Sequence, residues 1–176
     1  MVVETQTDTY LQQLVIRQVI AEDLPALEWE GEYAHYRNLY LDAFERARQG
    51  RSVLWVAELP VVGLIGQVFI QLICDRPELA DGHERAYLYG FRVREAYRDR
   101  GIGTYMMKII EDDLRQRGFR MITLNVAREN TRARHLYERH AYRIVAPEPG
   151  IWSYLDEKNI WHTVEEPAWR MEKRLL

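Results

Sequence analysis

The sequence predicts a mixed α/β fold in which helices pack on both sides of a central sheet. Short β-rich runs alternate along the chain with segments whose apolar residues recur at helical spacing. The 176 residues, 47% of them hydrophobic, suffice for one domain with a real core, so residues 1–176 are expected to form a single domain. No segment approaches the roughly 20 apolar residues of a membrane span. Residues 1–10 lack the pattern of a signal peptide, and we expect a cytoplasmic protein.

The predicted strands are rich in β-branched and aromatic residues and are bounded by turn-forming residues. Pro60 lies between the second and third of them, which indicates a hairpin. The segment between residues 146 and 168 contains three prolines and a glycine and is expected to be mostly loop. The predicted strands are residues 14–20, 52–58, 62–73, 85–93, 119–126, 141–146 and 168–176.

Three helical regions separate these strands. In residues 21–50, Asp23 can cap a helix that Gly31 divides into two and Gly50 ends. Residues 102–118 have apolar side chains at helical spacing and form an amphipathic helix that needs a sheet to pack on. Asn130 is placed to cap the third helix, at residues 131–140.

Charge is distributed unevenly along the chain. Residues 92–143 contain 13 cationic and seven acidic side chains, a balance of +6. Because the whole chain carries a net charge of −3, the remaining residues carry −9. The central segment therefore suits an anionic ligand and the remainder a cationic one, although any single arginine is better explained as part of a solvated helix face.

No metal site is predicted. The single cysteine, Cys74, excludes an internal disulfide and any multi-cysteine metal site. Its position at the end of an apolar run favours a buried structural thiol over a nucleophile. The five histidines show no metal-ligand spacing.

Residues 98–118, RDRGIGTYMMKIIEDDLRQRG, place Gly101 and Gly103 at the start of a helix. A P-loop needs Gly-Lys-Ser/Thr, and a dinucleotide-binding turn needs a third glycine where Met106 stands, so neither fits. Glycines still let a ligand approach the backbone, and a helix start offers unpaired N–H groups and the positive end of the helix dipole. A bound pyrophosphate and a tight turn without ligand both explain the two glycines.

A resemblance to the GNAT superfamily of N-acetyltransferases begins in this turn. In VREAYRDRGIGTYMM, the positions of the family's [RQ]-x-x-G-x-[GA] motif are filled by Arg98, Gly101 and Gly103. The order of the predicted elements also follows the family over almost the whole chain.

A second match lies in NTRARHLYERHAYRI, which resembles the family pattern N-x-x-A-x-x-L-Y-x-x-x-G-F. Asn130, Ala133, Leu136 and Tyr137 match it. The usual Gly-Phe is replaced by Ala-Tyr at residues 141 and 142, a change confined to a turn.

The resemblance implies a mainly antiparallel sheet flanked by helices, with the strand at residues 87–93 splayed from the one at 122–126. It implies acetyl-CoA as the acetyl donor, its pyrophosphate held by backbone amides of the turn and its pantetheine paired with the splayed strand. A backbone N–H of that strand is the implied oxyanion donor. The residues so assigned to the cofactor are Phe91, Arg92, Val93, Arg98, Asp99, Arg100, Gly101, Ile102, Gly103, Thr104, Asn130 and Tyr137.

The implied reaction is direct attack of a primary amine on a thioester, which needs a deprotonated amine and a proton for the departing thiolate. Tyr137 matches the family's general acid, and its other interpretation is a core aromatic residue. Asn130 matches a pantetheine-binding position and also suits a helix N-cap. Glu84 is the candidate general base, with a water chain past Tyr87 or Tyr89 as the alternative.

The acceptor, a small-molecule amine or a peptide amine, is expected to bind between residues 26–36 and 150–162. Both segments combine acidic and aromatic side chains, which suit a cationic amine with an apolar body. Tyr33, Tyr36 and Tyr40 have helical spacing, and aromatic residues with this spacing are more often part of a core. A homodimer is compatible with the sequence.

Two other functions are kept as alternatives. A regulatory module that binds coenzyme A without efficient transfer is favoured by the lack of a carboxylate in residues 85–93, whereas Tyr137 argues against it. A nucleic-acid binder would use the five arginines between residues 128 and 143. Their spacing spreads them around a short helix, so nucleic acid is not expected as a partner.

Overall fold

The computed structural model describes residues 11–176, so the polar start used for the signal-peptide prediction lies outside the described part of the chain. Seven strands form one sheet in the order β1-β2-β3-β4-β5-β9-β6, and β7 and β8 form a separate ribbon. Every neighbouring pair is antiparallel except β4 and β5, which are parallel. The strands are β1 (Val15–Gln18), β2 (Ser52–Leu59), β3 (Gly63–Gln71), β4 (Arg85–Val93), β5 (Met121–Ala127), β6 (Arg143–Glu148), β7 (Ile151–Leu155), β8 (Trp161–Glu165) and β9 (Ala168–Arg174).

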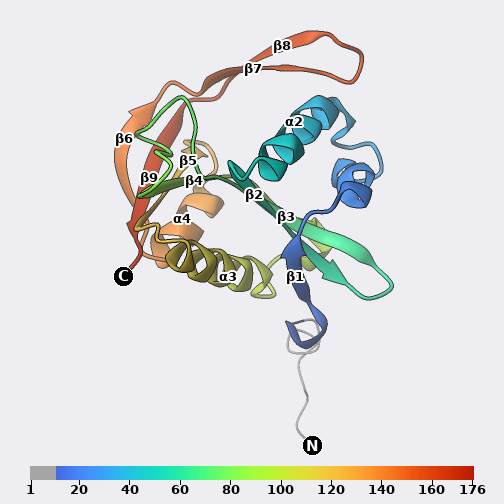
Figure 1. Cartoon of the computed structure of the whole chain (residues 1–176), viewed down its shortest axis with the longest axis horizontal. Helices are drawn as coiled ribbons and strands as arrows, with labels where there is room; N and C mark the ends of the chain where they lie inside the picture. Colours follow the sequence, from blue (N-terminus) through green and yellow to red (C-terminus); the bar gives the residue numbers. More distant parts are fainter. Residues whose placement is uncertain (1–10) are drawn as a thin grey trace, which may run out of the picture.

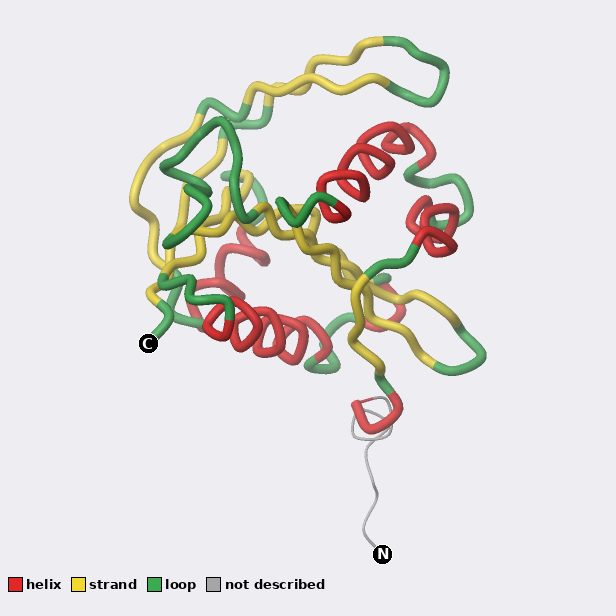
Figure 2. The backbone as a smooth tube through the Cα atoms, viewed as in Figure 1, coloured by secondary structure: helices red, strands yellow, loops and turns green. Residues whose placement is uncertain are grey.

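Helices cover both faces of this sheet, as predicted (Figure 1). One face carries α3 and α4, and the other carries α2 with the short helices η1 and η2 (Figure 2). The helices are η1 (Ala21–Glu28), η2 (Ala34–Tyr36), α2 (Arg37–Arg48), η3 (Glu95–Tyr97), α3 (Ile102–Gln116) and α4 (Thr131–Arg139).

The two apolar cores follow from strand alternation. In β2, Val53 and Trp55 pack into the core beneath α3, whereas Leu54 and Val56 pack into the core beneath α2. Because β2 is covered on both faces, nearly all of its residues are apolar instead of alternating with polar ones. The hairpin predicted around Pro60 is confirmed by the pairing of β2 with β3.

The predicted amphipathic helix is α3. Its buried face includes Met106, Ile110 and Leu114, which recur every four residues and so share one side of the helix. Gly118 follows the helix with a φ of +90°, a left-handed conformation that glycine adopts without a steric cost.

The first helical region differs from the prediction. Residues 21–28 and 34–36 form two 3-10 helices rather than α-helices, and Asp23 is not an N-cap. Asp23 lies three residues inside η1, where its carboxylate accepts the Ile20 N–H at 2.8 Å and pairs with Arg17 at 2.7 Å. Pro25 lies within η1 and lacks the N–H needed for a regular α-helix. Gly50 does end α2, with a φ of +74°.

The tail is more regular than predicted. Residues 151–165 form the β7–β8 hairpin, which lies over α2 in Figure 1, instead of a loop. Asp156 stabilises its turn by accepting the N–H groups of Lys158 and Ile160. Asn38 of α2 donates to the Asp156 carbonyl at 2.8 Å and so joins the hairpin to the helix. The loop prediction was wrong because it was based on the flanking prolines. The segments between them, IWSYL and WHTVE, have a composition that is typical of β structure.

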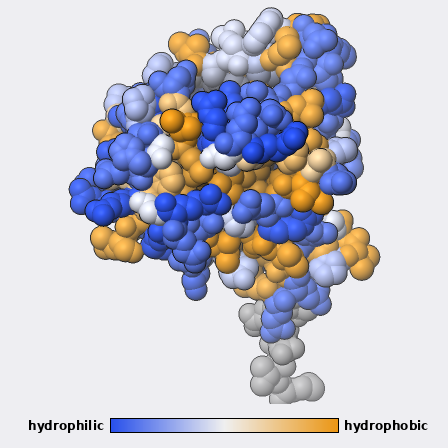
Figure 3. Space-filling model, in the orientation of Figure 1, coloured by the Kyte–Doolittle hydropathy of each residue, from blue (hydrophilic) through white to orange (hydrophobic). Residues whose placement is uncertain are grey.

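The surface in Figure 3 mixes hydrophilic residues with exposed hydrophobic ones. No helix within residues 11–176 is long and apolar enough to cross a membrane.

We expect Ile110→Ala to destabilise the protein strongly, because Ile110 is 1% exposed between α3 and the sheet. Removing a buried aliphatic side chain of this size costs about 2–5 kcal/mol, set by how far the cavity collapses. The free energy of unfolding in urea measures the loss. Lys108→Ala, an exposed change in the same helix, is the control and should shift stability by less than about 0.5 kcal/mol. Equal effects of the two changes would contradict the packing described above.

Candidate active site

The main feature of the site is a split in the sheet. The parallel pairing of β4 and β5 ends at Leu88 and Leu124. Beyond this point β4 stays paired with β3 as far as Val93, and β5 stays paired with β9 as far as Ala127. The facing edges of the two strands therefore keep N–H and C=O groups with no strand partner. The splay predicted for these strands is confirmed by this pairing.

A β-bulge at Gly90 decides which way the split end of β4 faces. Gln67 and Phe69 of β3 pair with Arg92 and Tyr89, so one extra residue lies on β4. Gly90 adopts a φ of +61°, typical of a bulge. Before the bulge, Leu88 packs towards α3. After the extra residue, Phe91 and Val93 pack towards α3 instead of the even-numbered residues. Arg92 consequently points to the α2 face.

A cavity of about 430 Å³ opens on the α3 side of the split, and we call it the turn cavity. Its wall combines the end of β4, residues 97–104 and one face of α4. Eleven of the twelve residues predicted to bind the cofactor line it, and Arg100 does not. The two sequence motifs, about 30 residues apart, thus meet at one cavity.

The start of α3 presents free backbone donors to the turn cavity. Gly101 is the N-cap with a φ of +79°, no side chain caps the helix, and its first turn contains no acidic residue. The first N–H groups of a helix lack intrahelical acceptors and lie at the positive end of its dipole. A Cβ on Gly103 would lie 3.3 Å from the Phe91 ring, so this glycine allows α3 to approach β4 closely.

Charged side chains surround this turn. Arg98 donates to the Val93 carbonyl at 2.9 Å, which holds the turn against the end of β4. Arg132 of α4 pairs with Asp99 at 2.6 Å across the cavity, and both side chains are exposed. The turn cavity is therefore rich in cations and backbone donors, which suits an anionic ligand.

Tyr137 is the buried titratable group of the turn cavity, with 7% of the residue exposed. Its ring packs edge-on against Tyr142, with centroids 5.7 Å apart. Burial raises the pKa of Tyr137 above its ordinary value, so the hydroxyl keeps its proton at neutral pH and can act as a donor. The prediction of a core aromatic residue and the prediction of a site residue therefore describe the same side chain.

Asn130 also combines two predicted features. It is the N-cap of α4, because its side-chain oxygen accepts the Ala133 N–H at 3.1 Å. It also lines the turn cavity.

Glu84 lies outside the site. It is exposed and immediately precedes β4, at the end of the strand opposite the split. Its carbonyl accepts the N–H groups of Arg120 and Met121, and its side chain lines neither cavity. The structure does not bring Glu84 and Tyr137 together, so the geometry gives no support to Glu84 as a general base. The sequence alone did not show which end of β4 is paired with β5, so it could not show that Glu84 lies at the end away from the split.

A second cavity of about 660 Å³ opens on the α2 side of the split, and we call it the aromatic cavity. Tyr33 and Tyr36 from the first helical region meet Trp152 of β7 there, with 6.1 Å between the ring centroids of Tyr36 and Trp152. The two segments predicted to form an acceptor site thus lie together. Trp161, by contrast, is 71% exposed on β8 and does not line the cavity.

Tyr87 and Tyr89 project from β4 into the aromatic cavity. Their rings stack with centroids 5.8 Å apart. Burial raises the pKa of each to about 12, so both hydroxyls are protonated at neutral pH. They can donate or relay a hydrogen bond but do not supply a negative charge.

Arg92 joins the two cavities, because it lines both. Its Nη2 donates to Gln67 Oε1 at 2.9 Å and to the Tyr40 hydroxyl, and its guanidinium lies 3.3 Å from the centroid of the Tyr33 ring. Gln67 in turn donates to the Gly90 carbonyl at 3.1 Å. Only backbone contacts were predicted for this part of β4 from the sequence. The polar Gln67 within an otherwise apolar strand was the sequence feature that could have indicated a buried polar contact here.

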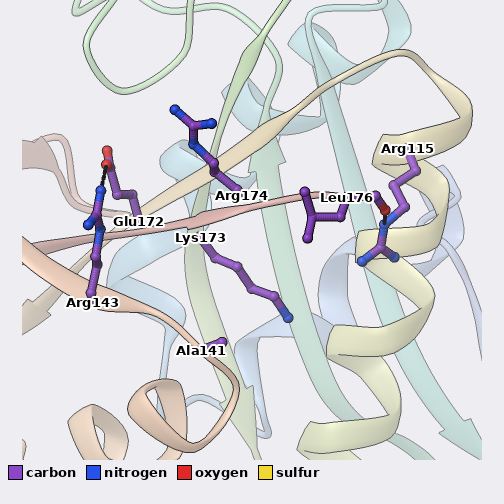
Figure 4. Close-up of a pocket in the computed structure, with 7 residues that line it drawn as sticks. All are labelled: Arg115, Ala141, Arg143, Glu172, Lys173, Arg174 and Leu176. Atoms are coloured by element: carbon purple, nitrogen blue, oxygen red, sulfur yellow. Dashed lines mark hydrogen bonds and ion pairs between the residues drawn. The ribbon is translucent and has the colours of Figure 1, made fainter.

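A third hollow, of about 600 Å³, lies far from the split at the end of β9 (Figure 4). Three of its cations are paired, since Arg143 contacts Glu172 while Arg115 and Lys173 contact Glu111. We therefore interpret these three cations as parts of structural ion pairs. Cys74 is also outside the two cavities, and it is half-buried rather than buried. No cluster of metal-ligating side chains occurs within the described residues.

Comparison with known proteins gives a family match over residues 17–142, to the acetyltransferase (GNAT) family. A curated relative, the uncharacterized N-acetyltransferase YycN of Bacillus subtilis, is 27% identical over 90 residues. That alignment covers 51% of this chain and 54% of the relative, so the chain spans about half the length of the curated relative it matches.

Solved structures share the fold. Ard1 from Thermoplasma volcanium superposes with a TM-score of 0.71 at 17% identity, covering 93% of this chain and 99% of Ard1. NAA60 of Arabidopsis thaliana in complex with acetyl-CoA gives a TM-score of 0.66 at 21% identity, covering 92% and 98% of the two chains. At these identities the likeness concerns the fold alone.

We expect Gly90→Ala to be more damaging than an ordinary glycine substitution. An added Cβ would meet the buried Phe69 ring at 3.2 Å in a backbone with a φ of +61°. The left-handed conformation alone costs an L-residue about 1–2 kcal/mol. Gly50→Ala is the matched control, because Gly50 has a φ of +74° and open space around its Cβ position. Urea unfolding should show a larger loss for Gly90→Ala, and equal losses would mean that the bulge tolerates a side chain.

Proposed function

Because the chain belongs to the GNAT acetyltransferase family, we propose that it is an N-acetyltransferase that transfers the acetyl group of acetyl-CoA to a primary amine. The observation that carries this proposal is the split between β4 and β5, which opens the turn cavity on one side and the aromatic cavity on the other. An acetyl donor bound on one side can then meet an amine bound on the other.

The residues of the turn cavity fit acetyl-CoA. The free N–H groups at the start of α3 and the nearby arginines suit its pyrophosphate, and the unpaired edge of β4 suits an extended pantetheine that adds to it like a strand. When bound, acetyl-CoA supplies an activated thioester. The backbone N–H groups of residues 91–93 are proposed to stabilise the developing oxyanion.

Tyr137 is the proposed general acid. Its burial keeps the hydroxyl protonated, and a departing thiolate needs a proton. The amine is proposed to lose its proton to water that enters the aromatic cavity past Tyr87 and Tyr89. Neither tyrosine needs to be ionised for such a relay.

A coenzyme-A-binding regulatory module is the second candidate. The position of Glu84 outside both cavities favours it, because this leaves the predicted carboxylate base away from the site. The two candidates predict the same cofactor binding and differ in transfer.

Gly103→Glu should weaken acetyl-CoA binding by roughly tenfold or more, because it adds a carboxylate where a pyrophosphate would approach the positive end of α3. Isothermal titration calorimetry measures the affinity. Gly103→Ala is the control, since it introduces the same contact with Phe91 but no charge. If both variants bind acetyl-CoA as the wild type does, the turn is not the pyrophosphate site.

Tyr137→Phe should leave acetyl-CoA affinity nearly unchanged and lower the rate of acetyl transfer by on the order of 10² to 10⁴. The change removes one hydroxyl and keeps the buried ring against Tyr142. Single-turnover transfer is the appropriate measurement, because product release can limit steady-state turnover. An unchanged transfer rate would make Tyr137 a packing residue, and lost affinity with normal transfer at saturation would make it a binding residue.

A further inference from the structure

Gln67 places a buried amide in the middle of β3. The residue is 1% exposed, and its neighbours along the strand, Gly66 and Val68, are buried as well. A buried amide is costly unless its polar groups are hydrogen-bonded. An apolar side chain of similar shape would avoid this cost, because such replacements in a core are often neutral or stabilising. Packing alone therefore does not explain why an amide occupies this position.

The amide of Gln67 joins the bulge to Arg92. Its Nε2 donates to the Gly90 carbonyl at 3.1 Å, and its Oε1 accepts from Arg92 Nη2 at 2.9 Å. A guanidinium can only donate and a carbonyl can only accept, so both contacts form in just one orientation of the amide. Arg92 thus fixes the direction of the N–H group that holds the Gly90 carbonyl.

Arg92 is itself held by the protein. Its Nη2 also donates to the Tyr40 hydroxyl, and its guanidinium lies 3.3 Å from the centroid of the Tyr33 ring. Within the described residues it forms no ion pair, and its Nη1 is buried without a hydrogen-bond partner. Burying a cation in this way costs stability. Groups that break a packing rule at such a cost are expected where a functional site has to be held in place.

The bulge lies where β4 has a strand neighbour on one side only. Pairing with β5 ends at Leu88, and the extra residue of β4 lies between its pairs at Tyr89 and Arg92. Gly90, with a φ of +61°, has no side chain to restrict its backbone. The Gln67 amide therefore supplies a fixed contact at the point where the bulge interrupts the ladder.

The same register determines which N–H groups of β4 face the split. Arg94 donates its N–H to the Ile65 carbonyl of β3 at 2.8 Å. Because the N–H groups of an antiparallel strand point alternately to its two sides, those of Phe91 and Val93 point away from β3. The Val93 carbonyl also points away, since it accepts from Arg98 of the turn at 2.9 Å. A bulge displaced by one residue would turn these groups towards β3.

We propose that Gln67 is a positioning residue for acetyl transfer: it holds the Gly90 carbonyl and thereby aims the N–H groups of Phe91 and Val93 at the thioester carbonyl. This inference rests on the proposed function and deepens it, because it names the side chain that orders the oxyanion donors. Donors stabilise a developing oxyanion best when their positions are fixed before the reaction. Both polar atoms of the amide are already engaged, so Gln67 acts through the backbone of β4.

The stretching frequency of the acetyl carbonyl in bound acetyl-CoA, labelled there with carbon-13, measures this contact by infrared difference spectroscopy. Hydrogen bonds polarise a carbonyl and lower its frequency, so the wild type should lower it relative to free acetyl-CoA. Gln67→Met removes both hydrogen bonds of the amide, and Gln67→Glu keeps the acceptor for Arg92 but loses the donor to Gly90. Both variants should return the frequency towards the free value.

The two variants should also lower single-turnover acetyl transfer by roughly 10- to 100-fold, the range expected when a catalytic contact is misplaced. Acetyl-CoA affinity, measured by calorimetry, should be nearly unchanged, because the glycine turn before α3 is kept. A merely structural role would lower stability without separating rate from affinity in this way. Gln67→Glu gains an ion pair with Arg92 and carries the test if Gln67→Met does not fold.

Thr123→Val is the matched control. Thr123 is buried in β5, and its hydroxyl donates to the Leu79 carbonyl at 2.6 Å, so the change also removes a buried hydrogen bond from a side chain to a carbonyl. Thr123 precedes the split and lines neither cavity. The change should reduce stability in urea and leave the carbonyl frequency and the transfer rate at wild-type values.

The carbonyl frequency separates this inference from the proposed function, because it needs binding but no transfer. A frequency that the wild type lowers and both Gln67 variants restore, without transfer by any of them, would retain the inference and refute the enzyme. The inference would be overturned by a wild-type frequency equal to that of free acetyl-CoA, by equal effects of Gln67→Met and Thr123→Val, or by wild-type transfer rates in the Gln67 variants of an active enzyme. A wild type that does not bind acetyl-CoA would overturn both.

Discussion

β4 and β5 separate after Leu88 and Leu124 because each stays paired with a different neighbour, and the other parts of the site depend on this separation. A continuous sheet would leave no passage between its two faces, since its backbone groups would be paired and its side chains packed. The split leaves the facing edges of both strands without a strand partner, and it lies between the cavity beside α3 and the cavity beside α2, which share Arg92. The core beneath α3 contains residues from both halves of the sheet, whereas the core beneath α2 contains strand residues from the β1–β4 half alone.

The bulge at Gly90 gives the opening its chemistry. One added residue changes which side chains of β4 face each core, so apolar Phe91 and Val93 pack beneath α3 and the cationic Arg92 faces the α2 side. The side chain of Gln67 then ties the bulge to Arg92 through hydrogen bonds to both. Backbone geometry and charge placement are therefore linked in one short stretch of strand.

Electrostatics differ on the two sides of the split. The turn cavity has helix-end N–H groups and arginines and suits an extended anion. The aromatic cavity has paired charges around its wall and an unpaired Arg92 at its inner end. Burial keeps Tyr137 of the turn cavity protonated, and the stacked Tyr87 and Tyr89 of the aromatic cavity are protonated for the same reason. The tyrosines that line the two cavities are therefore neutral, and the positive charge lies on arginine side chains and at the start of α3.

The sequence by itself determined the features that depend on neighbouring residues. The glycine turn before α3, the Asn130 cap and the face of α4 that bears Tyr137 were predicted because a few adjacent residues decide such conformations. The family signature lies in these local segments for the same reason. The seven strands of the sheet, as they follow one another along the chain, and the end of α2 at Gly50 were also predicted from local patterns.

The features that depend on the register between distant strands were decided by the tertiary structure alone. The position of Glu84 at the wrong end of β4, the β7–β8 hairpin over α2 and the direction of Arg92 follow from how strands pair and where one residue is added. In an extended strand a shift of one residue moves a side chain to the opposite face, and no neighbouring residue records that shift. The turn proposed to bind an anion was therefore predicted from the sequence, whereas the direction of the Arg92 side chain was not.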